Sequence, residues 1–145
     1  MIRHAAAVLV LGVVLTSPAR GDEKADLKKL EGTWLPAEAV FGGRNWPDEE
    51  RKAIKLVIAD GKYTVTVHGQ DDKGTLKLDT KAKPAAMDIV GTDGPNKGKT
   101  FPAIYELSGD TLKICYALDG KERPGTFESK PDTRLFLVTY KREKR

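Results

Sequence analysis

This sequence has little cysteine and histidine, and it has no large excess of either charge. It has one Cys and two His in 145 residues, and its 25 basic side chains nearly match its 21 acidic ones. One cysteine excludes an intramolecular disulfide framework and a metal site built from several cysteines. A balance so near neutrality argues against nucleic acid as a partner, because nucleic-acid-binding domains gather basic side chains on one face. The length and a hydrophobic share of 39% are those of one domain with its own core.

Long apolar runs are also absent, apart from one near the start. Met1–His4 is a short basic segment, Ala5–Leu15 is uncharged and apolar, and small residues precede Asp22. This is the layout of a secretory signal peptide, and the run is shorter than the ~20 residues of a membrane-spanning helix. We therefore expect residues 1–21 to be removed and residues 22–145 to form a soluble periplasmic or secreted domain. No cysteine lies near the expected cleavage site, so we expect no lipid anchor. No later stretch is long and apolar enough to cross a bilayer, so we expect no membrane span.

Beyond residue 31 the dominant pattern is an alternation of apolar and polar residues, which predicts half-buried strands. The predicted strands are Thr33–Phe41, Ile54–Ala59, Tyr63–His68, Thr75–Leu78, Ala86–Val90, Ala103–Leu107, Leu112–Tyr116, Thr126–Glu128 and Leu135–Tyr140. Asp60–Gly61 is a strong two-residue hairpin signal, and Asp71–Gly74 predicts the next turn. Short helices are expected at Asp22–Glu31 and Pro47–Lys52. The predicted fold class is all-β: one antiparallel domain of about eight strands with a short N-terminal helix, closed as a meander so that no edge is exposed.

Two sets of residues carry a resemblance to known families. Leu30–Trp34 places Gly-x-Trp at the start of the first strand, and this is similar to the opening signature of lipocalin-like barrels, in which the Trp packs against a basic residue of the last strand. The matching basic residue here is Lys141 or Arg142. The wider set of segments is Asp60–Val65, Gly74–Asp79, Lys83–Pro84, Met87–Ile89, Asp93–Thr100, Ile104–Cys115 and Arg123–Lys130.

In this order, the wider set resembles a secreted domain family of planctomycetes whose function is uncharacterised. The resemblance covers roughly residues 26–142. It implies a lipocalin-like up-and-down β-barrel in an extracytoplasmic protein. It implies no catalytic residue, because the family has none established.

Residues that could carry chemistry are few. His68 is the only histidine after residue 21, and a metal site there would need Asp71 and Asp72, which we read as turn residues. The serines of the expected mature chain, Ser108 and Ser129, lack the Gly-x-Ser-x-Gly context of a nucleophile. We therefore expect no metal, no cofactor and no enzymatic activity.

The aromatic residues leave two interpretations of the barrel interior open. Most of them fall on the alternating face of a strand, where they either fill the interior or line a cavity open at one end. Trp46 lies instead in the Gly42–Pro47 connection, as a plug or as a lid over a ligand. The first hypothesis is a non-enzymatic module that binds a small apolar or amphipathic molecule. Its predicted ligand-binding residues are Trp46, Tyr63, Tyr105, Ile114 and Tyr116.

The alternative hypothesis is a protein-interaction or envelope-structural domain. Its recognition loops would be Gly42–Pro47 and Asp119–Gly125, and its partner would be an envelope protein. Cys115 is expected on the outer face of its strand together with Lys113, unless the N-terminal helix covers it. Buried in this way it would be an inert apolar residue, and exposed it could cross-link two chains.

Overall fold

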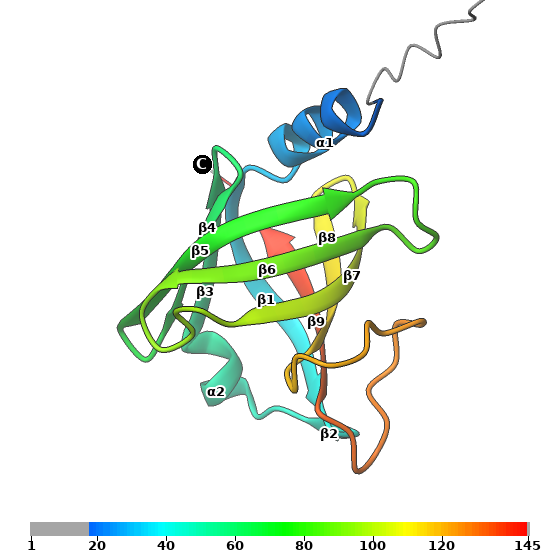
Figure 1. Ribbon diagram of the computed structural model, residues 1–145. Helices are drawn as coiled ribbons and strands as arrows, with labels where there is room; N and C mark the ends of the chain where they lie inside the picture. Colours follow the sequence, from blue (N-terminus) through cyan, green and yellow to red (C-terminus); the bar gives the residue numbers. More distant parts are fainter. Residues whose placement is uncertain (1–17, 145) are drawn as a thin grey trace, which may run out of the picture.

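The computed structural model describes residues 18–144 (Figure 1). Most of the expected signal peptide, residues 1–17, lies outside this range. Residues 18–144 form two helices and nine strands: α1 (Pro18–Lys29), β1 (Gly32–Phe41), β2 (Arg44–Asn45), α2 (Asp48–Lys52), β3 (Ile54–Ala59), β4 (Lys62–Val67), β5 (Gln70–Asp79), β6 (Ala86–Asp93), β7 (Thr100–Ser108), β8 (Thr111–Ala117) and β9 (Leu135–Arg142). No helix in this range is long and apolar enough to cross a membrane.

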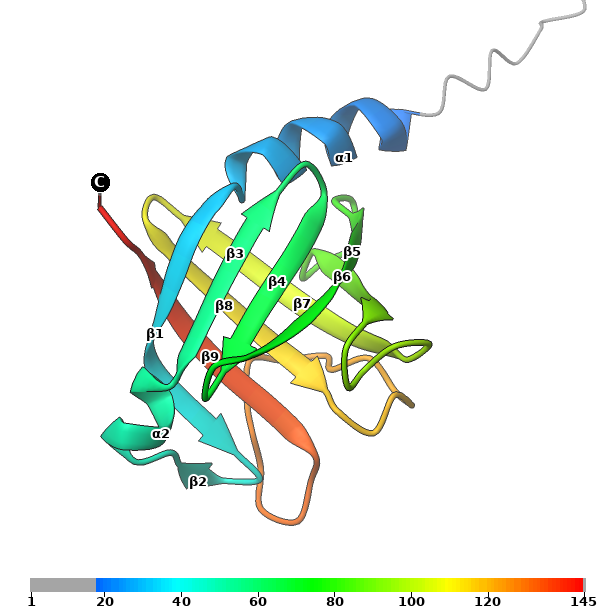
Figure 2. The same ribbon diagram turned by 90° about the vertical axis from the view of Figure 1, so that its left-hand side faces the viewer.

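The strands form one closed antiparallel barrel. Consecutive strands pair in the order β1-β3-β4-β5-β6-β7-β8-β9, and β1 also pairs with β9 from Trp34↔Arg142 to Phe41↔Phe136. The two-residue β2 only extends the end of β1. Closure satisfies the backbone groups that the first and last strands would otherwise expose. The predicted all-β fold, an up-and-down barrel of eight strands with a short N-terminal helix, is confirmed, and Figure 2 shows α1 across one end of it.

Most strand boundaries follow from the sequence pattern. Along β3, Ile54, Leu56 and Ile58 are buried while the residues between them are exposed or half-buried. The hairpin turn at Asp60–Gly61 has φ of 52° and 73°, both in the left-handed region that a two-residue turn of type I′ requires.

One turn differs from the prediction. The β4–β5 hairpin turns at His68–Gly69, where φ is 49° and 79°, and Asp71–Gly74 belongs to strand β5. The aspartates do not need to form a turn, because each of them has a hydrogen-bond partner in its place on β5. Asp71 accepts a hydrogen bond from Thr66 at 2.7 Å, and Asp72 accepts two from Asn96. The expected strand from residue 75 therefore begins five residues earlier.

A second difference concerns residues 126–128, which do not form a strand. They belong to the long connection between β8 and β9, which packs on the outside of the barrel. Arg123 in this connection donates hydrogen bonds to the main-chain oxygens of Met87 and Ala103 and forms an ion pair with Asp88. The connection also covers Cys115, which is fully buried.

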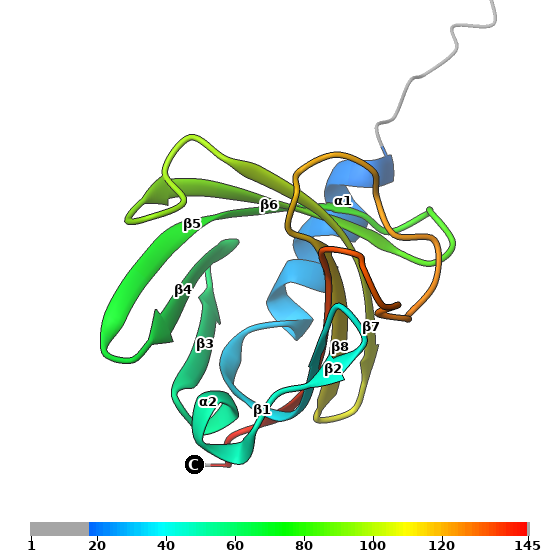
Figure 3. The same cartoon turned by 90° about the horizontal axis from the view of Figure 1, so that it is seen from below.

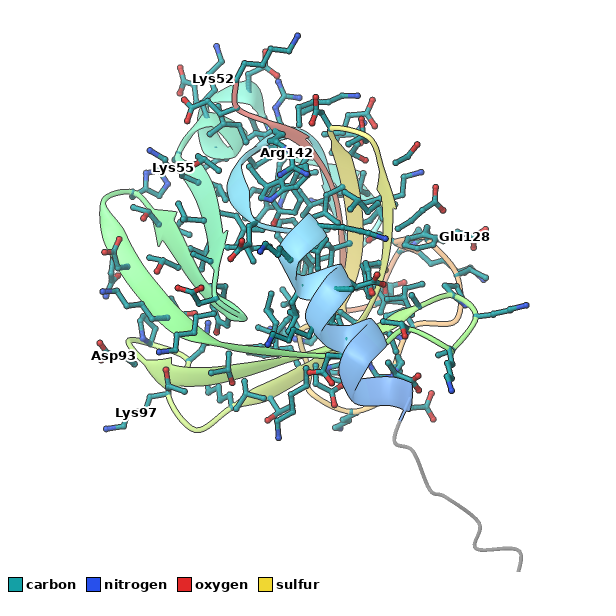
Figure 4. The ribbon with its side chains drawn as sticks, turned by 90° about the horizontal axis from the view of Figure 1, so that it is seen from above. Lys52, Lys55, Asp93, Lys97, Glu128 and Arg142 are labelled. Atoms are coloured by element: carbon teal, nitrogen blue, oxygen red, sulfur yellow. The ribbon has the colours of Figure 1, made fainter. Side chains whose placement is uncertain are left out.

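The thiol of Cys115 lies 3.6 Å from the main-chain oxygen of Glu128, the residue that Figure 4 shows outside the strands. Cys115 is thus on the outer face, as expected, but the cover is this connection and not the N-terminal helix. Burial raises the pKa of its thiol, as for an inert residue.

The end of the barrel beneath α1 is closed by Trp34 and Arg142. The Trp34 indole is fully buried and donates to the main-chain oxygen of Leu30 at 2.9 Å. The Arg142 guanidinium lies over this ring at 4.3 Å, so Arg142 is the basic residue of the last strand that the Gly-x-Trp pattern predicts. It also donates to the main-chain oxygens of Lys29 and Glu31 and pairs with Asp110 at 3.0 Å. Figure 4 shows Arg142 beside the last turn of α1.

We predict that Arg142→Met lowers the free energy of unfolding by about 2–4 kcal/mol, because the helix-end carbonyls and Asp110 lose a charged donor together. Urea denaturation followed by far-UV circular dichroism measures this without relying on Trp34 fluorescence. Lys141→Met is the matched control: this exposed neighbour on the same strand should change stability by no more than about 0.5 kcal/mol. Equal stability of the two variants would contradict a closing role for Arg142.

Candidate functional site: a cavity in the open half of the barrel

The barrel interior is packed in one half and hollow in the other. Beneath α1, the buried side chains of Leu30, Trp34, Leu78 and Leu112 fill it. The other half contains a cavity of about 710 Å³. Its lining includes loop residues such as Lys99 and Asp119, which follow the strands at the end away from α1. Figure 3 looks into that end of the barrel, with α1 across the far side.

The walls of the cavity are mostly apolar. The apolar and aromatic lining residues are Trp46, Ile54, Leu56, Ile58, Tyr63, Val65, Val67, Leu76, Met87, Ile89, Phe101, Ile114, Tyr116, Leu118, Phe136 and Tyr140. The polar ones are Asp72, Asn96, Lys99, Thr100, Asp119 and Arg134. The sequence left open whether the aromatic side chains fill the barrel or line a cavity. The structure has both: the half beneath α1 is filled, and the other half contains the cavity.

Four of the five predicted ligand-binding residues line this cavity: Trp46, Tyr63, Ile114 and Tyr116. Tyr105 does not. It lies on β7 in the half nearest α1, where its hydroxyl donates to Asp26 at 3.3 Å, and it borders a smaller cavity of about 370 Å³ beside the helix. Tyr105 does face inward, as its alternation predicts. The sequence could not show that the barrel is filled around Tyr105 and hollow in the half farther from α1.

Three tyrosines that project into the barrel line the cavity: Tyr63, Tyr116 and Tyr140. Tyr116 and Tyr140 come from paired strands and their hydroxyl oxygens are 2.8 Å apart. Tyr63 projects from β4, and its hydroxyl is the one buried side-chain polar atom of residues 18–144 without a hydrogen-bond partner. We refer to these three side chains as the tyrosine floor. Tyr140 is one of the aromatic residues on an alternating strand, but it is not among the ligand-binding residues predicted from the sequence. Its contact with Tyr116 could not be read from the sequence of β9 alone.

The tyrosine floor is neutral at ordinary pH. Burial raises the pKa of Tyr63 to about 12, and the charge of the nearby Asp72 adds to the shift. Burial likewise raises the pKa of Tyr140 to about 12, although its hydrogen bond with Tyr116 opposes the shift. Burial, with the neighbouring hydroxyls of Tyr140 and Tyr63, raises the pKa of Tyr116 further. The floor therefore presents phenol O–H groups and no phenolate.

The position of Tyr63 depends on a glycine in the neighbouring strand. Gly74 is its partner in the β4–β5 pairing, and the Tyr63 ring lies directly over it. A Cβ atom at Gly74 would lie 2.7 Å from the Tyr63 hydroxyl oxygen and 2.0 Å from the main-chain oxygen of Val90. Only glycine leaves room for both, so Gly74 sets the place of the Tyr63 hydroxyl at the floor.

The rim of the cavity is built by loops that the strands hold in place. Asp72 faces inward from β5 and accepts hydrogen bonds from the backbone and side-chain amides of Asn96, which fixes the β6–β7 loop at the rim. On another side, Trp46 is half-buried against Phe136, with ring centroids 4.8 Å apart. Its backbone N–H donates to Ala39 at 2.8 Å. Trp46 therefore stands at the mouth of the cavity, as its place in the sequence suggests. Asp72 is not identified as a cavity residue from the sequence, because the sequence pattern places it in a turn.

The residues considered for metal binding or catalysis do not form one site. His68 pairs with Glu50 at 3.1 Å, whereas Asp71 and Asp72 bond to Thr66 and Asn96. Within residues 18–144 no group of three or more His, Cys, Asp or Glu side chains is arranged to hold a metal ion. Ser129 donates to the main-chain oxygen of Leu135. The arrangement that the structure does provide is an apolar cavity with hydrogen-bonding groups at its floor and rim.

We predict that Gly74→Ala lowers the free energy of unfolding by about 2–4 kcal/mol, because the new methyl group overlaps the Val90 carbonyl and displaces Tyr63. Chemical denaturation measures the loss. Gly125→Ala is the control, because a Cβ atom there meets nothing within 4 Å. Its stability should stay within about 0.5 kcal/mol of the original chain. The steric argument fails if the two alanine variants are equally stable.

A second prediction concerns alkaline pH. All four tyrosines of the chain have a pKa raised above the ordinary value of 10.0 in the folded state. The unfolded chain therefore loses these protons first, so the free energy of unfolding is unaffected by them below pH 10 and falls as the pH rises from about 10 toward about 12. Ultraviolet absorbance of phenolate should be nearly absent at pH 10 in the folded protein and half-developed in the denatured chain. Equal phenolate absorbance in both states would contradict the buried floor.

Comparisons with known proteins give no relative from which a function could be carried over. The chain matches no protein-family model, no curated protein and no solved structure. A function for this chain must therefore be argued from the cavity and from the residues that line it.

Proposed function

We propose that this protein binds a small, largely apolar molecule inside the open half of its barrel and acts as a binding module rather than as an enzyme. The observation that carries this proposal is the cavity of about 710 Å³ with its apolar walls. Ligand sites in proteins have volumes of roughly 300–1,000 Å³, with apolar walls and a few polar groups that orient the ligand. A closely packed core leaves few voids larger than a water molecule, so a hollow of this size needs an occupant.

The distribution of polar groups also supports a binding role. Polar side chains occur at the tyrosine floor and at the rim, and the wall between them consists of residues such as Leu56, Ile89 and Ile114. Transfer of apolar ligand surface from water to such a wall contributes about 25 cal/mol per Å². The hydrocarbon part of a ligand would thus supply most of the affinity, and the polar groups would set its orientation.

We also propose that binding takes place outside the cytoplasm, in the periplasm or after secretion. The support is the basic, apolar and small-residue pattern of residues 1–21. Membership of the secreted planctomycete family that the sequence resembles is part of the same proposal. A binding module in these compartments would meet small apolar molecules that are poorly soluble on their own.

The alternative function, recognition of an envelope protein by loops, is less well supported. Trp46 of the Gly42–Pro47 loop and Asp119 of the Asp119–Gly125 loop both line the cavity. Arg123 of the second loop donates hydrogen bonds to the main-chain oxygens of Met87 and Ala103 in the barrel wall. These residues thus have roles within the barrel, and no feature of the loops favours a protein partner.

The proposal predicts one binding site for N-phenyl-1-naphthylamine, a neutral apolar dye whose fluorescence rises when it leaves water. Val65→Trp, which places a large ring in the cavity wall, should weaken its binding by about tenfold or more, equivalent to about 1.4 kcal/mol. Val57→Trp is the matched control: Val57 is also half-buried, but lies on the outer face of the adjacent strand. Its affinity should stay within about twofold.

Native mass spectrometry of the protein as purified from its own cells gives a second readout. An extra mass that disappears on denaturation would identify the class of the natural ligand. The proposal is wrong if the dye does not bind and no small molecule accompanies the protein, or if both tryptophan variants, folded by circular dichroism, bind the dye like the original chain.

A further inference from the structure

The tyrosine floor contains more hydrogen-bond donors than it uses. The Tyr63 hydroxyl is buried and has no partner. The contact of 2.8 Å between the hydroxyls of Tyr116 and Tyr140 uses one of their two hydrogens. Within residues 18–144, the other hydrogen has no second acceptor. Tyr63, Tyr116 and Tyr140 all line the cavity, so two O–H donors without a partner belong to side chains of its wall.

Unsatisfied donors at this place are unusual for a protein interior. A buried hydroxyl without a partner costs about 1–3 kcal/mol, so most buried polar groups are paired. The Tyr63 hydroxyl lies over Gly74 together with the edge of its ring, and it forms no hydrogen bond that the fold requires. The hydroxyl is explained if its partner is supplied by the occupant of the cavity.

We propose that the ligand carries an uncharged hydrogen-bond acceptor, a carbonyl oxygen or a similar group, which lies against the hydroxyls of Tyr63 and of the Tyr116–Tyr140 pair while its hydrocarbon body extends toward the mouth. This inference rests on the proposed function and narrows it to a chemical class. It assigns the recognition of one polar atom to the tyrosine floor and the remaining affinity to the apolar walls.

The charges around the cavity favour a neutral acceptor over an anion. The two cationic lining residues, Lys99 and Arg134, immediately precede β7 and β9 at the mouth. The carboxylate of Asp72 lines the same cavity, and its negative charge adds to the raised pKa of Tyr63. This negative charge would repel a carboxylate or phosphate placed beside the hydroxyls, whereas a neutral oxygen meets only the two donors.

Three probes with the same two phenyl rings test this inference: diphenylmethane, benzophenone and diphenylacetate. They carry no polar group, a neutral carbonyl and a carboxylate, respectively. Displacement of N-phenyl-1-naphthylamine from the intact protein at pH 7 gives the three dissociation constants. We expect benzophenone to bind about fivefold more tightly than diphenylmethane, the effect of about one net hydrogen bond, and diphenylacetate to bind more weakly than benzophenone.

Tyr63→Phe removes the proposed donor and keeps the ring over Gly74. It should bring benzophenone close to the affinity of diphenylmethane and leave diphenylmethane itself unchanged. The variant should be at least as stable as the original chain toward urea, because the lost hydroxyl has no partner within the protein. Tyr105→Phe is the control, because its hydroxyl bonds to Asp26 and does not line the cavity. The preference for benzophenone should survive this change.

The outcomes separate the two proposals. If none of the probes displaces the dye and the dye itself does not bind, the proposed function fails. If diphenylmethane and benzophenone bind equally well, or if Tyr63→Phe keeps the preference for benzophenone, the cavity binds apolar molecules but the tyrosine floor does not recognise a polar atom. A tighter binding of diphenylacetate than of benzophenone would overturn the choice of a neutral acceptor.

Discussion

Pairing of the first strand with the last is the constraint on which the rest of this structure depends. Once β1 and β9 are hydrogen-bonded, the number of strands fixes the width of the interior, and eight strands enclose a space that side chains can just fill. Arg142 holds this closure where the strands meet α1, because it covers Trp34 and bonds to the end of the helix. With the width fixed, the sizes of inward-facing side chains decide where the barrel is solid. Trp34, Leu30 and their neighbours fill the half beneath the helix, and the inward residues of the other half leave a cavity between them.

The cavity and the tyrosine floor are parts of one arrangement. Burial of three phenols in an apolar interior is unfavourable unless their hydroxyls are bonded, and the protein bonds only Tyr116 and Tyr140 to each other. Gly74 adds a further constraint, since it weakens β5 as an isolated strand and is needed to let Tyr63 lie flat. Both features oppose stability locally, and the closed, fully paired barrel around them supplies the compensation. Such local costs are found most often at binding sites, where an occupant completes the contacts.

Local pattern was enough to predict the barrel but not its hollow. Alternation in β3 and the Asp60–Gly61 turn are properties of short segments. The resemblance carried by Gly-x-Trp implied a basic partner for Trp34 at Lys141 or Arg142, and the structure shows that it is Arg142. The turn between β4 and β5 is misplaced in the sequence prediction because adjacent aspartates favour a turn over a strand. Their partners Thr66 and Asn96, which the local pattern does not reveal, hold them in β5. The cavity depends on how inward residues from all eight strands add up at each level of the barrel. No single segment of the sequence shows this combined volume. Tyr63 and Tyr105, which both face inward, therefore could not be told apart from the sequence.

The floor and the rim of the cavity are built to different degrees of precision. Each floor tyrosine projects from a strand paired on both sides, so its hydroxyl has little freedom. The rim consists of connections: the β6–β7 loop is fixed through Asp72, whereas Trp46 is held by one backbone hydrogen bond and by contact with Phe136. Groups on strands are positioned more precisely than groups on loops. For the binding role that we propose, discrimination between ligands would therefore belong to the floor and passage into the cavity to the rim, whose aromatic ring takes no part in the hydrogen bonds that close the barrel.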